Sequence, residues 1–174
     1  GGHNGRDETT TFCLIPMVKE QITIPLIAAG GIGTGKGMLA AMTLGADAVQ
    51  IGSRFVATPE SSAHQAFKET VVDAKEGDTL LTLKELTPVR LVKNEFFQKV
   101  SEAYQNHASP SELANLLGKG RAKKGMFEGD LVEGELEIGQ ISGLIHEIKP
   151  AAEIVREIIE EFKDSQKTMS SITI

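Results

Sequence analysis

The chain has 174 residues, 40% of them hydrophobic and 24% charged, with a formal net charge of -6 and a pI near 5.3. This length and composition predict a globular protein with one sizeable core. The acidic balance argues against a large nucleic-acid surface, and the single cysteine excludes an internal disulfide and a cysteine-pair zinc site. No apolar run approaches the ~20 residues of a membrane helix. We therefore expect a cytoplasmic protein without a membrane span or a metal site.

The first part of the chain, residues 1–58, is expected to form βα units. Helical spacing predicts a first helix that Pro16 bends, and apolar runs that end at glycines predict strands buried on both faces. In chain order we expect a helix over 9–21, a strand over 24–29, a helix over 36–44 and a strand over 46–51. Because a complete eight-fold barrel takes about 250 residues, this α/β pattern predicts the C-terminal portion of a (β/α)8 TIM barrel.

Residues 59–149 are expected to form a mainly helical insert over the substrate site. The patterns predict helices over 63–75, 95–104 and 111–117 and short strands over 79–83 and 89–92. Residues 118–139 carry six glycines among many charges, which predicts a long functional loop rather than a buried element. Its short basic cluster is expected to be a solvated turn rather than a phosphate-binding patch (Arg121, Lys123, Lys124).

The end of the chain is expected to form an amphipathic helix that packs on the barrel, over residues 150–168. Its predicted apolar face includes Ile154 and Ile158 together with Val155 and Ile159. Residues 169–174 are expected to form a loose tail.

Two glycine corners carry the clearest functional signal. Gly30-Gly31 follows the first predicted strand and Gly52-Ser53 follows the second. On neighbouring parallel strands their N–H groups would form a concave cluster of donors that suits an anion. Glycine lets a phosphate approach the backbone, and the helix that begins near residues 34–36 would point its positive end at the same place. The alternative is that these glycines only make tight βα turns.

The strings GGHNG (1–5) and AAGGIGTGKGMLAAMTLGADAVQIGSRF (28–55) resemble the active-site histidine loop and the flavin-phosphate turns of the nitronate monooxygenase (2-nitropropane dioxygenase) family. That family includes the flavin-type enoyl-acyl-carrier-protein reductase. The resemblance implies FMN as cofactor and His3 as the catalytic residue beside the flavin ring. It also implies a set of cofactor-binding residues: Gly2, Ala29, Gly30, Gly31, Gln50, Gly52 and Ser53.

Other side chains near these motifs are less sharply assigned. By its position in the family, Gln140 is expected to line the substrate site. Arg54 could reach the phosphate or pair with an acid. The corners are also similar to those of inosine-monophosphate dehydrogenases, which need a nucleophilic cysteine in the loop where this chain has His3. Cys13 falls within the first predicted helix and is expected in the core.

The resemblance implies a nitronate monooxygenase as the first hypothesis and an enoyl-acyl-carrier-protein reductase as the alternative. In a nitronate monooxygenase, an alkyl nitronate reduces FMN and oxygen reoxidises it, giving a carbonyl compound and nitrite. In an enoyl-acyl-carrier-protein reductase, NADH or NADPH reduces FMN, which passes hydride to an enoyl thioester. A third, non-enzymatic interpretation is an inactive phosphate-binding barrel fragment.

The expected partners follow from these interpretations. They are a small-molecule nitronate or an enoyl thioester, the N-terminal half of the barrel, and a second copy in a homodimer, but neither nucleic acid nor membrane. Because the chain starts like the middle of a loop, it is expected to be truncated and inactive alone.

Overall fold

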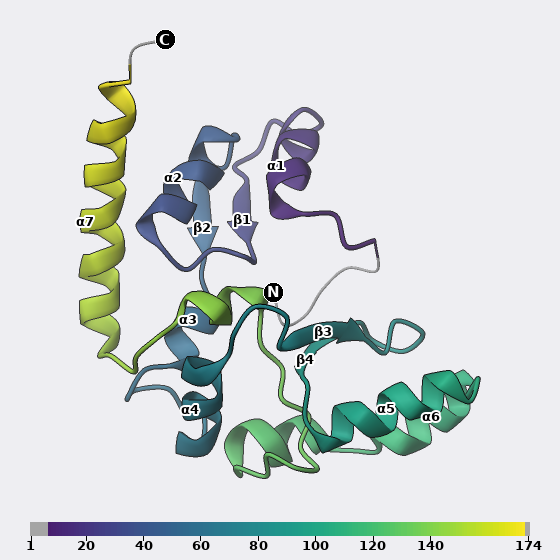
Figure 1. Ribbon diagram of the computed structural model, residues 1–174. Helices are drawn as coiled ribbons and strands as arrows, with labels where there is room; N and C mark the ends of the chain where they lie inside the picture. The colour runs from purple at the N-terminus through teal and green to yellow at the C-terminus, as the bar shows by residue number, and fades with distance from the viewer. Residues whose placement is uncertain (1–6, 173–174) are drawn as a thin grey trace.

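The computed structural model describes residues 7–172, which form a βα region, an insert and a long C-terminal helix (Figure 1). The βα region contains α1 (Thr11–Lys19), β1 (Ile27–Ala29), α2 (Gly35–Thr43), β2 (Ala48–Gln50) and α3 (Ser53–Val56). The insert contains α4 (Gln65–Asp73), β3 (Thr79–Thr82), β4 (Val89–Val92), α5 (Glu95–Gln105), α6 (Pro110–Leu117), η1 (Lys123–Phe127) and η2 (Gln140–Leu144), and α7 (Ala151–Ser170) follows.

The two strands of the βα region pair in parallel, with Ala29 opposite Gln50. Helix α2 connects the two strands, and residues at its two ends define where it begins and ends. The Thr34 hydroxyl accepts a hydrogen bond from the Gly37 N–H at its start, and Gly45 adopts a φ of +112° just past its end. Apolar side chains from α1, the strands and α2 form one small core: Ile15, Ala28, Ile32, Ala41 and Ala46.

The strands are shorter and less buried than the sequence predicts. Ile27 is 60% exposed, and Ala29, Ala48 and Gln50 are also exposed. The expectation of strands buried on both faces is therefore wrong for residues 7–172. The physical reason is that these residues supply only two strands to the parallel sheet, whereas two-sided burial needs layers on both faces.

The insert is built around an antiparallel hairpin and two further cores. Strand β3 pairs with β4, and the helices α5 and α6 pack beside the hairpin at one end of the molecule (Figure 1). The Ser109 hydroxyl and the Glu112 carboxylate cap each other's backbone N–H groups at the start of α6. Gly118 ends that helix with a φ of +65°, in the left-handed region that favours glycine.

Residues 118–139 are more ordered than the glycine-rich composition predicts. Leu136 and Ile138 are 1% and 2% exposed and belong to the core around Phe67. The backbone beside them joins β4, since the Val92 N–H donates to the Leu136 carbonyl at 2.9 Å. Residues 118–139 form no strand of their own and bridge to β4 only between Glu137 and Leu91, but the two inward-facing side chains, Leu136 and Ile138, belong to the core.

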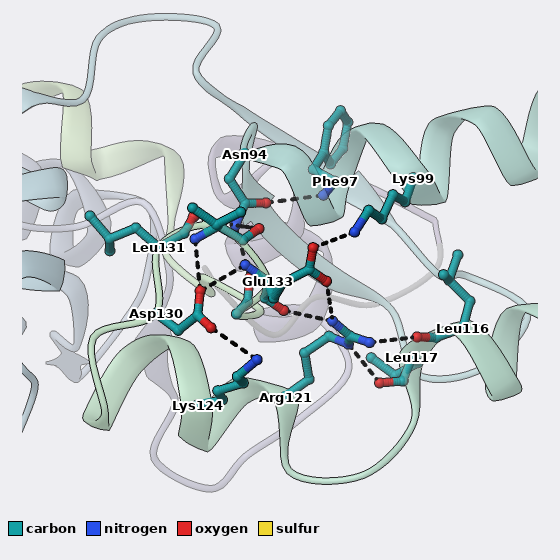
Figure 2. Close-up of polar contacts among 12 residues, drawn as sticks. Asn94, Phe97, Lys99, Leu116, Leu117, Arg121, Lys124, Asp130, Leu131 and Glu133 are labelled. Carbon is teal, nitrogen blue, oxygen red and sulfur yellow. Dashed lines mark hydrogen bonds and ion pairs between the residues drawn. The ribbon is translucent and has the colours of Figure 1, made fainter.

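A polar network holds this segment against α5 and α6 (Figure 2). The Asn94 amide donates to the Leu131 and Gly134 carbonyls, both at 2.8 Å. The Asn94 carbonyl oxygen accepts from the Phe97 N–H at the start of α5. The Arg121 guanidinium lies 4.3 Å from the centre of the Phe96 ring.

The basic cluster in this segment is neutralised within the chain. Its three ion pairs are Arg121 with Glu133, Lys123 with Glu128 and Lys124 with Asp130. These cations pair with carboxylates and do not form an open phosphate-binding patch, as the sequence interpretation expects.

Helix α7 lies along α2 and is longer than expected (Figure 1). Ile154 and Ile158 are buried, whereas Val155 and Ile159 are 49% and 39% exposed, so only part of the predicted apolar face is covered. The helix runs to Ser170, into the segment expected to be a loose tail. Within residues 7–172, no helix has the length and apolar character that crossing a membrane requires.

Candidate functional site

The two glycine corners meet at one edge of the parallel sheet. Because Ala29 lies opposite Gln50, the turns that follow them leave the strands side by side. They open into a pocket of about 440 Å³, lined by Ala29, Gly30, Gly31, Ile32, Gln50, Gly52, Ser53, Val56, Met126, Glu137, Ile138 and Ile141. The structure thus brings together all six described residues that the sequence assigns to the cofactor: Ala29, Gly30, Gly31, Gln50, Gly52 and Ser53.

The backbone at the corners explains why glycine is needed. Gly30 and Gly31 have φ values of +92° and +71°, in the left-handed region that favours glycine. Gly52 has an ordinary φ of -105°, and a Cβ added there would meet nothing within 4 Å. The absent Cβ at Gly52 therefore leaves open space in the pocket for a ligand.

Donors remain available at both corners. Among residues 7–172, no acceptor pairs with the backbone N–H of Gly31 or of Gly52. The Gly30 carbonyl is turned toward α1, where the Thr11 hydroxyl donates to it at 3.0 Å. Paired N–H groups of this kind form a concave site that suits an anion.

Ser53 connects the second corner to the insert. Its hydroxyl oxygen accepts a hydrogen bond from the Gly139 N–H at 3.1 Å. Because a hydroxyl both donates and accepts, its own proton remains free to donate to an anion in the pocket.

The start of α2 does not face this pocket with free donors, contrary to expectation. The Glu161 carboxylate of α7 accepts a hydrogen bond from the Gly35 N–H at 2.6 Å. The Gly35 N–H at the positive end of α2 is therefore satisfied within the chain and is not available to a ligand.

The insert supplies four pocket residues that sequence reasoning missed: Met126, Glu137, Ile138 and Ile141. The alternation of Leu136 and Ile138 with Glu135 and Glu137 was the available signal, since it places the acids on the opposite face from the core. Glu135 is 7% exposed, and burial together with the neighbouring Glu137 raises the pKa of its carboxyl to about 7. Glu135 itself does not line the pocket, but its partner in this interaction, Glu137, does.

The remaining sequence-assigned residues lie elsewhere. Gln140 lines a separate pocket of about 420 Å³ with Lys75, Gly77 and Gly143, so its role in substrate binding stays a prediction. His3 and Gly2 lie outside the described residues. Residues 7–172 contain no group of three or more His, Cys, Asp or Glu side chains that could hold a metal ion.

Two further side chains point away from the pocket. Arg54 is buried, and its guanidinium donates to the Glu147 carbonyl at 3.3 Å. Burial lowers the pKa of Arg54, while Glu157 and Glu147 act in the opposite direction, so Arg54 faces the acids rather than the corners. Cys13 is exposed, and its expected place in the core is wrong, because α1 turns Ile15 inward instead.

Curated relatives share the sequence of this region. A probable nitronate monooxygenase from Staphylococcus saprophyticus is 38% identical over 139 residues, which is 72% of this chain and 39% of that protein. Another from Bacillus subtilis is 34% identical over 157 residues, which is 85% of this chain and 45% of that protein. The chain spans less than half the length of these two relatives.

Solved structures share the fold. FabK from Thermotoga maritima matches with a TM-score of 0.90 and 42% identity, over 98% of this chain and 53% of that one. Nitroalkane oxidase from Streptomyces ansochromogenes matches with a TM-score of 0.76 and 31% identity, over 97% of this chain and 50% of that one. Because both are TIM-barrel enzymes of which about half is matched, the predicted partial barrel is confirmed.

The family follows from the sequence as a whole. The nitronate monooxygenase family model matches residues 1–161, which include both corners and the whole insert. The chain therefore belongs to the nitronate monooxygenase family of oxidoreductases.

Proposed function

We propose that this chain forms the phosphate-binding part of an FMN-dependent oxidoreductase. One observation carries the proposal: two corners open into the same pocket, and the N–H groups of Gly31 and Gly52 find no acceptor among residues 7–172. A phosphate dianion fits such a site because both corners line one pocket and no Cβ at Gly52 blocks its approach.

The rest of the pocket suits the chain that joins a flavin ring to its phosphate. Gln50 and Glu137 offer polar groups for sugar hydroxyls, whereas Val56, Ile138 and Ile141 offer apolar contacts. When bound, FMN would supply hydride transfer, and the protein would bind and orient it. His3 is proposed to lie beside the ring, where it could hold or move a proton at the substrate.

Reduction of an enoyl-acyl-carrier-protein thioester is the reaction that we favour. Its support is that the chain is more similar to FabK than to nitroalkane oxidase, in both sequence identity and TM-score. In this reaction NADH or NADPH would reduce the flavin, and the enoyl thioester would receive the hydride.

Oxidation of alkyl nitronates is the second candidate. It is supported by the family model and by the names of the curated relatives. Both reactions require residues beyond this chain, because the chain spans about half of each solved relative. We therefore propose that the flavin ring and the substrate also contact the other half of the barrel.

One experiment separates these possibilities. The full-length protein is purified, and its flavin absorbance is followed without oxygen after adding NADH or NADPH and then crotonyl thioester. Bleaching by the nicotinamide and recovery on the thioester supports the reductase. Bleaching by propionate 3-nitronate, with oxygen uptake in air, supports the monooxygenase instead. A protein that takes up no FMN contradicts both and leaves the inactive phosphate-binding interpretation.

A further inference from the structure

The backbones of α2 and α7 touch at the start of α2. A Cβ built on Gly35 would collide with the Phe162 nitrogen and with the Ile158 carbonyl oxygen. Both obstacles are main-chain atoms, which cannot move aside as the end of a side chain can. Gly35 therefore permits a close approach of the two helices that another residue would prevent.

A carboxylate fixes this contact. The Glu161 Oε2 atom accepts a hydrogen bond from the Gly35 N–H at 2.6 Å, and Oε1 lies 3.7 Å from the Lys36 ammonium. Charge-assisted hydrogen bonds of this kind are among the stronger ones in proteins. The first N–H of α2 is thus held by a residue 126 positions further along the chain.

The other end of α7 is tied to the chain that follows the second corner and α3. The Glu60 carboxylate accepts from the Ala151 N–H, the first of α7, at 3.1 and 3.2 Å from its two oxygens. The segment before α7 also holds α3, since the Lys149 N–H donates to the Ala57 carbonyl at 3.3 Å. Helix α7 therefore connects the elements that follow both corners.

We propose that Glu161 is a positioning residue for the cofactor phosphate. By holding Gly35, it fixes the turn from Gly30 to Thr34, and so the distance between the N–H groups of the two corners. A single phosphate can use both corners only while that distance is kept. This inference deepens the proposed function and rests on it.

The test compares variants of the full-length protein. Glu161→Ala removes the acceptor, whereas Glu161→Gln keeps an oxygen that can accept from Gly35. Glu160→Ala is the matched control, because it removes an equal charge from the neighbouring, exposed position. Ile154→Val is the stability control, because it removes one buried methyl group from α7, seven positions before Glu161, and leaves the Glu161 carboxylate in place.

Two measurements are made: the Kd for FMN by fluorescence titration, and the ³¹P NMR shift of the bound phosphate. Glu161→Ala is expected to raise the Kd about tenfold, and Glu161→Gln to restore it to within about twofold. The ³¹P shift should move in Glu161→Ala alone. The two control variants should bind FMN as the wild type does.

The outcomes distinguish this inference from the proposed function. If Glu161→Ala binds FMN with an unchanged Kd and ³¹P shift, the inference is wrong and the proposed function stands. If Ile154→Val raises the Kd as much as Glu161→Ala, Glu161 acts only through stability and the inference is again wrong. If the wild type takes up no FMN, both are wrong.

Discussion

The corner region and the insert are held together by different kinds of interaction. The corners follow three-residue strands, and they are held by glycine backbone conformations and a few main-chain hydrogen bonds. The insert rests on two cores of buried side chains and on the network around Asn94 and Arg121. We infer that changes in the insert should mainly alter the stability of the fold, whereas changes at the corners should mainly alter ligand binding.

The largest effect is expected from the core of the insert. Phe96 is fully buried and carries the Arg121 guanidinium over its ring. Phe96→Ala should lower the free energy of unfolding by about 4 kcal/mol, because it removes a large apolar side chain and leaves a cavity. Urea unfolding measures this. Phe12→Ala is the control, since Phe12 is 69% exposed, and an equal loss there would contradict the comparison.

The corner should respond in the opposite way. Gly52→Val should raise the Kd for FMN about 100-fold, because the added side chain fills space that the phosphate would occupy. Stability should change little, since no atom lies within 4 Å of the new Cβ and φ is ordinary. Fluorescence titration and thermal unfolding of the same samples check both parts. Ala40→Ser, at an exposed position of α2, should leave both unchanged.

A smaller loss of stability is expected at Asn94. Its amide donates to two carbonyls of the 118–139 segment, and its oxygen caps α5. Asn94→Ala should therefore cost about 2 kcal/mol of unfolding free energy, by loss of the cap and of satisfied carbonyls. The Kd for FMN should equal that of the wild type within error. A raised Kd at unchanged stability would contradict the division between the two regions.

An effect of about the same size is expected to depend on pH. The carboxyl of Glu135 has a pKa raised from 4.5 to about 7, so the folded state binds its proton more tightly than the unfolded state does. Its contribution to stability is therefore present below pH 4.5 and is lost as the pH rises through about 7.

Glu135→Gln removes this dependence. It should stabilise the protein at pH 8 by about 2 kcal/mol relative to the wild type, with a smaller gain at pH 5. Urea unfolding at the two pH values measures the difference. Glu160→Gln, at an exposed site, should show no such difference, and a gain for Glu135→Gln that is equal at both pH values would refute the assignment.

The sequence predicts the corner region better than the insert, for a physical reason. Glycine turns after apolar runs are local signals, so the order of residues along the chain is enough to assign Gly31 and Gly52 to one pocket. The burial of Leu136 depends on pairing with β4, which is distant in sequence, and the charged residues beside it conceal the pattern. The contact of Glu161 with Gly35 is equally invisible, since nothing local marks an acceptor 126 positions away.

The hydrogen bond between Gly139 and Ser53 has a consequence for how such enzymes could diversify. It joins residues 86 positions apart, so the intervening chain leaves the barrel and returns to it at nearly one point. The entropy of closing an excursion grows only slowly with its length. A module of different size or shape could therefore be inserted between these two attachment points while the proposed phosphate site is kept.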